Sequence, residues 1–249
     1  MDKPQLVDAH NYSSLMRRWR ILSKRAGLKF SRIGEADGYP CYEICSPVLS
    51  KDDGVYLSTG IHGDEAGAVS GLLQWAEKNM NLLSSLPLLI YPCLNPWGLE
   101  NNSRLNPQRL DLNRVWDGSA TPLIAKIMQN IRDYHFRISV CMHEDYDGQG
   151  IYLYAPGGSQ KVRKKADHIL SAAEVSIPRD SRRKIEGRKC TNGMIFPRPS
   201  KLPEEGVPEA LFLYKNCGRE NYTFETPSEW SIQTRATAHS QMIEAALKS

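Results

Sequence analysis

The order of hydrophobic and polar residues predicts helices and strands that alternate along the chain. Between residues 13 and 26, apolar side chains recur at helical spacing among basic residues, so we expect an amphipathic helix that ends before Gly27. Further helices are predicted at 65–80, 122–134, 161–173, 208–214 and 229–247. Strands are predicted at 28–33, 39–45, 54–59, 86–91, 137–142, 151–154 and 221–224. This alternation is typical of an α/β sandwich on a mixed, mostly parallel sheet.

Two segments interrupt the pattern. Residues 95–118 are rich in Asn, Pro and Arg and have almost no periodicity, and such a stretch inside a domain is usually a functional loop. Residues 178–208 are rich in Pro, Gly and basic residues and give no clear prediction. Because no repeat, low-complexity tract or interdomain linker is visible, we expect one domain over residues 1–249.

Composition narrows the class of protein. The chain has 249 residues, 41% of them hydrophobic and 24% charged, which is ordinary for a globular protein with a substantial core. The net charge of +4 comes from scattered basic residues without a nucleic-acid motif, so we expect no nucleic-acid partner. No apolar run approaches the roughly 18 residues of a membrane span, and no secretory signal is visible. The six cysteines form no CxxC pair, which favours a reducing compartment, the cytoplasm.

A candidate metal site begins at His62, which follows the strand predicted at 54–59. Glu65 lies three residues later, on the turn that opens the next helix, so both side chains can reach one metal ion. His143 directly follows the strand predicted at 137–142. Because the carboxyl ends of parallel strands meet at one edge of a sheet, His143 is our third candidate ligand. Three protein ligands with an open fourth position are typical of catalytic zinc.

Hydrolysis of an amide also needs a base that activates water and donors that stabilise the oxyanion. Glu225 follows the strand predicted at 221–224, at the same expected edge, and is our candidate base. Arg104 and Arg114 carry rigid forks of donors. One of them is expected to bind a substrate carboxylate and the other to polarise the scissile carbonyl. Asn113 is expected to help orient the carboxylate.

Further polar residues lie near these candidates. Glu144 and Asp145 directly follow His143 and are competing ligands, although supporting or surface acids are the preferred interpretation. Asp111 is expected to hold an arginine in place. Two histidines within helical patterns of polar residues are expected at the surface: His168 and His239.

Together these motifs resemble the M14 zinc metallocarboxypeptidase superfamily, which includes the aspartoacylase and succinylglutamate desuccinylase branch. The matching motifs are His62-Gly-Asp-Glu65, Asn95-Pro-Trp-Gly98, Arg104-Leu-Asn106, Asp111-Leu-Asn-Arg114, His143 and Glu225-Thr-Pro227. The short spacing from Arg104 to Arg114 is similar to that of short bacterial carboxypeptidases and murein-peptide amidases. Arg109 falls where those short members often have glycine.

The resemblance implies a three-layer α/β/α sandwich that forms a single zinc carboxypeptidase-like catalytic domain. It implies one zinc ion per chain, with three ligands: His62, Glu65 and His143. It also implies that Asn113 and Arg114 bind the substrate carboxylate, that Arg104 stabilises the oxyanion, and that Glu225 acts as general base and then as acid.

Three functions are compatible with these motifs. The leading hypothesis is a cytoplasmic zinc metallocarboxypeptidase that hydrolyses an amide bond next to the free carboxylate of a peptide. The alternative is a zinc-dependent N-acyl amino acid deacylase; that branch often carries a C-terminal domain over the site, and the residues after about 230 are too few to form one. A non-catalytic binding protein is the third. Four basic residues suggest acidic substrates: Arg188, Arg198, Lys215 and Arg219.

Overall fold

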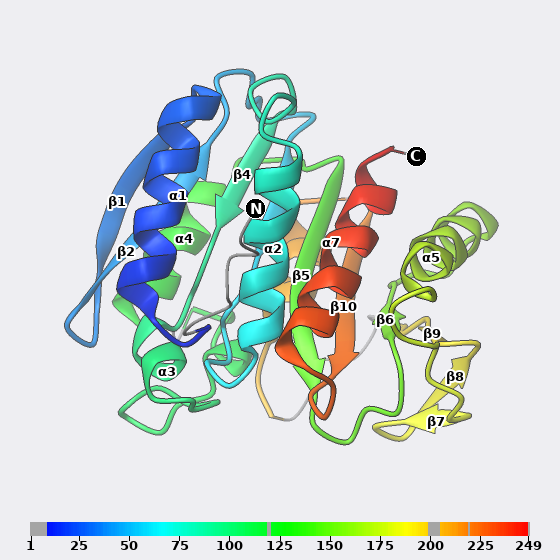
Figure 1. Ribbon diagram of the computed structural model, residues 1–249. Helices are drawn as coiled ribbons and strands as arrows, with labels where there is room; N and C mark the ends of the chain where they lie inside the picture. Colours follow the sequence, from blue (N-terminus) through cyan, green and yellow to red (C-terminus); the bar gives the residue numbers. More distant parts are fainter. Residues whose placement is uncertain (1–8, 119–120, 199–204, 219, 249) are drawn as a thin grey trace, which may run out of the picture.

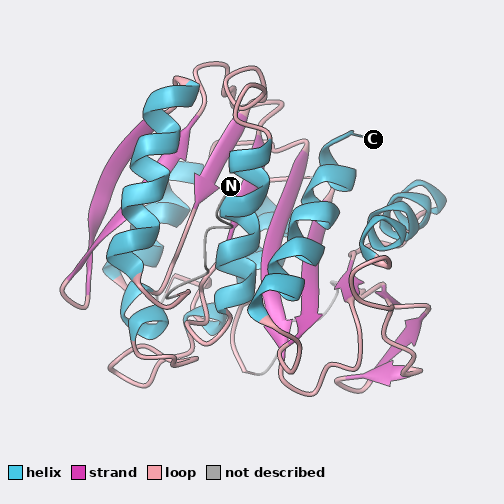
Figure 2. Ribbon diagram, in the orientation of Figure 1, coloured by secondary structure: helices cyan, strands magenta, loops and turns pink. Residues whose placement is uncertain are grey.

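The computed structural model describes residues 9–118, 121–198, 205–218 and 220–248. In these residues ten strands form one sheet in the order β1-β2-β4-β3-β5-β10-β6-β9-β8-β7 (Figure 1, Figure 2). The strands are β1 (Lys29–Ala36), β2 (Tyr39–Cys45), β3 (Val55–Ser58), β4 (Leu88–Tyr91), β5 (Ile138–Asp145), β6 (Tyr152–Tyr154), β7 (Lys184–Ile185), β8 (Arg188–Thr191), β9 (Met194–Ile195) and β10 (Asn221–Pro227). The helices are α1 (Tyr12–Ala26), α2 (Ala66–Lys78), α3 (Pro96–Glu100), the 3-10 helix η1 (Leu112–Arg114), α4 (Pro122–Ile131), α5 (Gln160–Ala173), α6 (Glu209–Asn216) and α7 (Ile232–Lys248).

Helices cover both faces of the sheet. The side chains of α1, α2, α5 and α7 form one hydrophobic core with the near face of the central strands, and α2 and α7 lie side by side (Figure 1). On the far face, α4 and α6 pack over a second core that includes Tyr56, Tyr91 and Phe136. The predicted three-layer α/β/α sandwich is therefore confirmed.

The sheet is mixed, and its parallel part is central. Strands β4, β3, β5 and β10 run parallel to one another. Most outer strands pair antiparallel, so five of the nine strand pairings in the described residues are antiparallel and the sheet is less parallel than expected. The four central strands end at the same edge, which carries His62, His143 and Glu225 as predicted.

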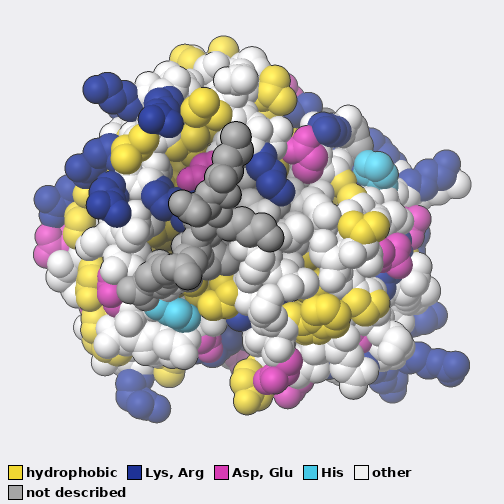
Figure 3. Space-filling model, viewed as in Figure 1, with side chains coloured by type: hydrophobic (Ala, Val, Ile, Leu, Met, Phe, Trp, Pro, Cys, Tyr) yellow, Lys and Arg dark blue, Asp and Glu magenta, His cyan; other side chains and the backbone are white. Residues whose placement is uncertain are grey.

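Helix α1 shows how local sequence defines an element. The Asn11 side chain accepts a hydrogen bond from the Ser14 N–H at 2.7 Å, and Gly27 ends the helix with a left-handed φ of 69°. Leu15 and Trp19 are buried against the sheet, whereas the basic side chains of the helix face solvent. Figure 3 shows Lys and Arg gathered on this side of the molecule. The predicted amphipathic helix is confirmed.

Two predicted strands are longer than their apolar runs. β5 includes His143 and β10 includes Glu225, both of which we expected after the strand ends. The strands pair in register through both residues because the ladder consists of backbone hydrogen bonds, which form whatever the polarity of the side chains. The described part of the unpredicted segment 178–208 contains β7, β8 and β9.

Two further features concern the cysteines and the helices. All six cysteines are free, and five of them are buried. None of the helices formed by the described residues combines the length and apolarity needed to cross a membrane.

Candidate metal centre and active site

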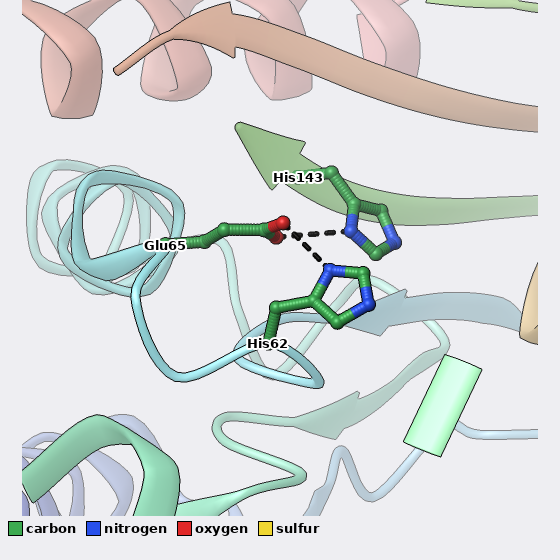
Figure 4. Close-up of side chains that lie close together, drawn as sticks. All are labelled: His62, Glu65 and His143. Atoms are coloured by element: carbon green, nitrogen blue, oxygen red, sulfur yellow. Dashed lines mark hydrogen bonds and ion pairs between the residues drawn. The ribbon is translucent and has the colours of Figure 1, made fainter. Parts of the chain in front are cut away.

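Three side chains from separate elements converge at the carboxyl edge of the central strands (Figure 4). His62 lies in the turn after β3, Glu65 caps α2, and His143 lies in β5. One Glu65 oxygen is 2.6 Å from His62 Nδ1, and the other is 2.9 Å from His143 Nδ1. A ligand atom of each residue lies within 4.8 Å of the other two, and all three side chains are buried. The structure thus brings the predicted ligands together.

The turn that carries His62 depends on a close backbone contact at Gly63. A Cβ atom at this position would lie 1.9 Å from the carbonyl carbon of Gly98. The Gly63 N–H donates to the Ser103 carbonyl at 3.0 Å, and Asn95 accepts from the Gly98 N–H at 2.9 Å. The Asn95 motif therefore supports the ligand turn, and the contact leaves no space for a side chain on Gly63.

Asp111 orients the His62 ring. Its Oδ1 lies 3.1 Å from His62 Nε2, so that Nε2–H donates to Asp111 and the Nδ1 atom faces Glu65. Its Oδ2 accepts from Arg104 Nη2 at 3.1 Å, the arginine contact that the sequence suggests. No local sequence pattern predicts the contact between Asp111 and His62, because 49 residues separate the two positions.

The buried charges shift the pKa values of the cluster. Burial lowers the pKa of His62, but the Glu65 and Asp111 carboxylates outweigh it and raise this pKa to about 9. Burial raises the pKa of Glu65, but the two imidazoles outweigh it and lower this pKa to about 2. At His143 the Glu65 carboxylate likewise overcomes burial and raises the pKa. The cluster therefore stabilises positive charge next to Glu65, whether from protons or from a metal cation.

The donor set fits a catalytic transition metal. Two imidazole Nδ1 atoms and one carboxylate approach one another from three elements. This combination of ligands is found in catalytic zinc sites, in which three protein ligands leave a position for water or substrate.

Arg104 lies against the same cluster. Its Nη1 is 3.2 Å from His62 Nδ1 and 3.8 Å from Glu65 Oε1. Asp111 holds the other end of the guanidinium, and 43% of the side chain is exposed. The donors of Arg104 are therefore fixed next to the cluster but open to a substrate, as the stabilisation of an oxyanion requires.

Glu225 lies next to His143 across the sheet. The two residues are direct partners in the parallel pairing of β10 with β5, and Tyr152 is the partner of Glu225 on the other side. Burial raises the pKa of Glu225 well above its ordinary range, His143 opposes this shift, and the Glu65 charge reinforces it. A raised pKa favours the protonated form, so a carboxyl group in this environment accepts a proton more readily than an exposed one.

Asn113 and Arg114 belong to η1, which follows Asp111 directly in the chain. Asn113 Oδ1 accepts from the Glu209 N–H at 2.9 Å, which leaves the Nδ2 amide as the donor side. Arg114 Nη1 donates to the Asn113 carbonyl at 2.9 Å, and its Nε lies 3.5 Å from the exposed Glu205. In the described residues neither side chain forms a hydrogen bond or ion pair with His62, Glu65 or His143.

Arg109 keeps the geometry of its turn without glycine. Its φ is 59°, in the left-handed region that glycine adopts most easily. Its N–H donates to the Asn106 carbonyl at 2.9 Å.

Family comparison agrees with this geometry. The catalytic-domain model of the succinylglutamate desuccinylase/aspartoacylase family matches residues 51–178. The chain belongs to this family. The predicted M14 resemblance is confirmed, and the match contains every predicted site residue except Glu225. No protein with a curated description matches the chain.

Solved structures share the fold of this desuccinylase/aspartoacylase family member. A provisionally named metallopeptidase from Shewanella denitrificans OS217 has a TM-score of 0.84 at 19% identity and covers 96% of this chain and 90% of that chain. A metallo-carboxypeptidase from Burkholderia cenocepacia has a TM-score of 0.70 at 15% identity over 96% and 68% of the two chains. The murein-tripeptide amidase MpaA from Escherichia coli O157 has a TM-score of 0.59 at 16% identity over 88% and 90%.

In this family member the two competing acids lie outside the ligand cluster. The Glu144 side chain points to the opposite face of β5 from His143, where it accepts from the Gly67 N–H at 3.2 Å and pairs with Arg235. Asp145 pairs with Arg182 at 3.0 Å. Both acids therefore form ion pairs outside the cluster, in agreement with the interpretation that they are supporting or surface acids. No local sequence pattern indicates that Arg235 is the partner of Glu144.

Proposed function

We propose that the chain is a zinc metallocarboxypeptidase that hydrolyses the amide bond next to a free substrate carboxylate. The observation that carries the proposal is the convergence of His62, Glu65 and His143, with Glu225 as the strand neighbour of His143. Metal-assisted hydrolysis of an amide uses a metal site and a proton-exchanging group that lie close together, and this arrangement can supply both. Membership of the desuccinylase/aspartoacylase family independently supports a metal-dependent hydrolase.

In this proposal a few residues share the steps of the reaction. His62, Glu65 and His143 would hold zinc, which as a Lewis acid lowers the pKa of water and polarises a carbonyl group. Glu225 accepts a proton from the attacking water and returns it to the leaving amine. Arg104 donates to the oxygen on which negative charge develops, because its guanidinium is already fixed beside the cluster.

Substrate binding is assigned to η1. The Asn113 amide donor and the Arg114 guanidinium can hold a carboxylate by charge-assisted hydrogen bonds. This contact aligns the adjacent amide bond with the metal cluster and so restricts cleavage to the bond next to the carboxylate.

The test starts with metal analysis of the purified protein. The same sample is then incubated with peptides, muropeptides and N-acyl amino acids, and the products are read by mass spectrometry. We expect one zinc per chain and loss of a C-terminal unit from substrates with a free carboxylate. Protein that neither retains nor binds zinc would overturn the proposal.

A second candidate is a zinc-dependent N-acyl amino acid deacylase. The matching family model favours it, because that family is described by its desuccinylase and aspartoacylase members. The same incubation separates the two, since a deacylase releases acyl groups from N-acyl amino acids and leaves peptides intact. The expected substrate is accordingly a peptide or an N-acyl amino acid in the cytoplasm, processed within one catalytic domain.

A further inference from the structure

Glu209 is a buried carboxyl group that the proposed mechanism does not use. It is the first residue of α6 and only 1% exposed. Its Oε1 accepts from the Tyr56 hydroxyl at 2.5 Å, and Ser58 and Cys141 lie beside the same carboxyl group. In the described part of the chain no Lys or Arg forms an ion pair with it. Buried carboxylates in proteins usually have a cationic partner, so the lack of one here needs an explanation.

The carboxyl group lies on the face of the sheet that also carries the ligand His143. Tyr56 and Ser58 are two residues apart on β3, and Cys141 and His143 are two residues apart on β5, so each pair points to one face. Ser58 and Cys141 are direct partners in the pairing of these strands. Glu209 therefore lies over the strand positions that precede the metal cluster.

The backbone of Glu209 is also joined to the proposed carboxylate site. Its N–H donates to Asn113 Oδ1 at 2.9 Å, and the Val207 N–H donates to the Arg114 carbonyl at 2.9 Å. The start of α6 is thus fixed to η1 by two hydrogen bonds. The backbone of Glu209 is therefore joined to the residues that would bind the substrate carboxylate, and its side chain lies on the sheet face that carries His143.

We infer that Glu209 selects substrates in which the residue with the free carboxylate has a cationic side chain. This inference rests on the proposed function. The α-carbon of this substrate residue carries the free carboxylate, the nitrogen of the scissile amide and the side chain. Asn113 and Arg114 would hold the carboxylate and the zinc ligands would hold the amide, so the side chain is the group that remains for Glu209. An ammonium or guanidinium at its end supplies the cation that Glu209 lacks, whereas an acidic side chain would bring two carboxylates together.

This specificity is opposite to the one suggested by scattered basic residues. The side chains of Arg188, Arg198 and Lys215 are exposed, and Arg219 lies outside the described residues. An exposed cation interacts weakly with a substrate because water and salt screen it. A buried carboxylate next to the site has a larger effect on the choice of substrate.

The test compares substrates that differ only at the residue with the free carboxylate. Zinc-loaded protein is assayed with alanyl dipeptides and N-acyl derivatives of lysine, norleucine and glutamate, in both L and D forms. We expect kcat/KM for the lysine member to exceed that for norleucine by about 10- to 100-fold, as for a charged hydrogen bond. Glu209→Gln keeps an acceptor for Tyr56 and should bring the ratio of the lysine and norleucine kcat/KM values close to one. A preference for norleucine or glutamate, or a lysine preference that survives in the variant, overturns the inference.

Binding of the free amino acids gives a readout that does not depend on turnover. By calorimetry, lysine should bind the zinc-loaded protein more tightly than norleucine, and Glu209→Gln should make the two affinities equal. Equal affinities in the unaltered protein overturn the inference, whereas lysine selectivity without turnover of any substrate would overturn only the proposed function. The matched control is Glu244→Gln on α7, where the carboxylate accepts from the Trp75 indole N–H at 2.9 Å; it should keep the lysine preference.

Discussion

Asp111 Oδ1 lies 3.1 Å from His62 Nε2, on the opposite side of the imidazole from Glu65. A carboxylate in this position fixes the ring orientation and the tautomer, and makes the ligating nitrogen a better donor to a metal. Asp111→Ala should therefore weaken zinc binding by about 10- to 100-fold without loss of the fold. The measurement is competition with a chromophoric chelator at fixed pH, together with a circular dichroism spectrum.

Asp133→Ala provides the control for this change. Asp133 is exposed and pairs with Lys51 at 3.5 Å, so its loss should leave zinc affinity unaltered. Equal zinc affinity in Asp111→Ala and the unaltered protein would mean that the hydrogen bond to His62 does not orient the ligand.

Glu225→Gln should separate metal binding from catalysis. The amide keeps the size of the side chain but cannot exchange the proton, so turnover should fall by about 10²- to 10⁴-fold while zinc content and melting temperature stay close to normal. Glu220→Gln is the matched control, because Glu220 directly precedes β10 and pairs with Lys161 at 2.6 Å, away from the ligand cluster. Near-normal kcat in Glu225→Gln would remove this residue from the mechanism.

The sequence predicts the cluster because its two histidines follow strands that the apolar pattern identifies, and Glu65 lies only three residues after His62. His62 and His143 follow apolar runs, and parallel strands bring such positions to one edge of the sheet. The predicted ends of β5 and β10 are too early, because the last residues of each strand are polar although their backbones still pair. The apolar pattern records which side chains are buried in the core, and it does not report where a hydrogen-bonded ladder ends.

Buried polar residues on helices are harder to predict from sequence. His239 lies among polar neighbours and is expected at the surface, but it is fully buried and its Nε2 lies 3.1 Å from the Thr226 hydroxyl. The cause is the close approach of α2 and α7, since a Cβ on Gly71 would lie 2.5 Å from the His239 Cβ. Glu209 is missed for a similar reason, because its partner Tyr56 lies 153 residues away. Such pairs depend on tertiary packing and leave no local pattern.

Arg114→Ala should affect substrates according to their charge. For substrates with a free carboxylate, loss of a charge-assisted hydrogen bond should raise KM by about 10- to 100-fold. Amidated or esterified analogues lack the charge that Arg114 recognises, so their kinetics should change little. Arg132→Ala is the control. Arg132 is exposed and its Nε lies 3.6 Å from Asp133 Oδ1, so its loss should not change the kinetics of charged or uncharged substrates. Equal losses on charged and uncharged substrates would exclude Arg114 as the carboxylate-binding residue.

Gly63→Ala should disturb the turn that positions His62. The added methyl group would lie 1.9 Å from the Gly98 carbonyl carbon, a backbone atom that cannot move aside as a flexible side chain does. Overpacking of this kind costs about 1–3 kcal/mol, so the variant should unfold at lower urea concentration and bind zinc more weakly. Gly34→Ala is the matched control, because a Cβ there meets no atom within 4 Å and the φ of Gly34 is not in the left-handed region. A Gly63→Ala protein with the urea midpoint and zinc affinity of the unaltered chain would show that this contact does not constrain the ligand turn.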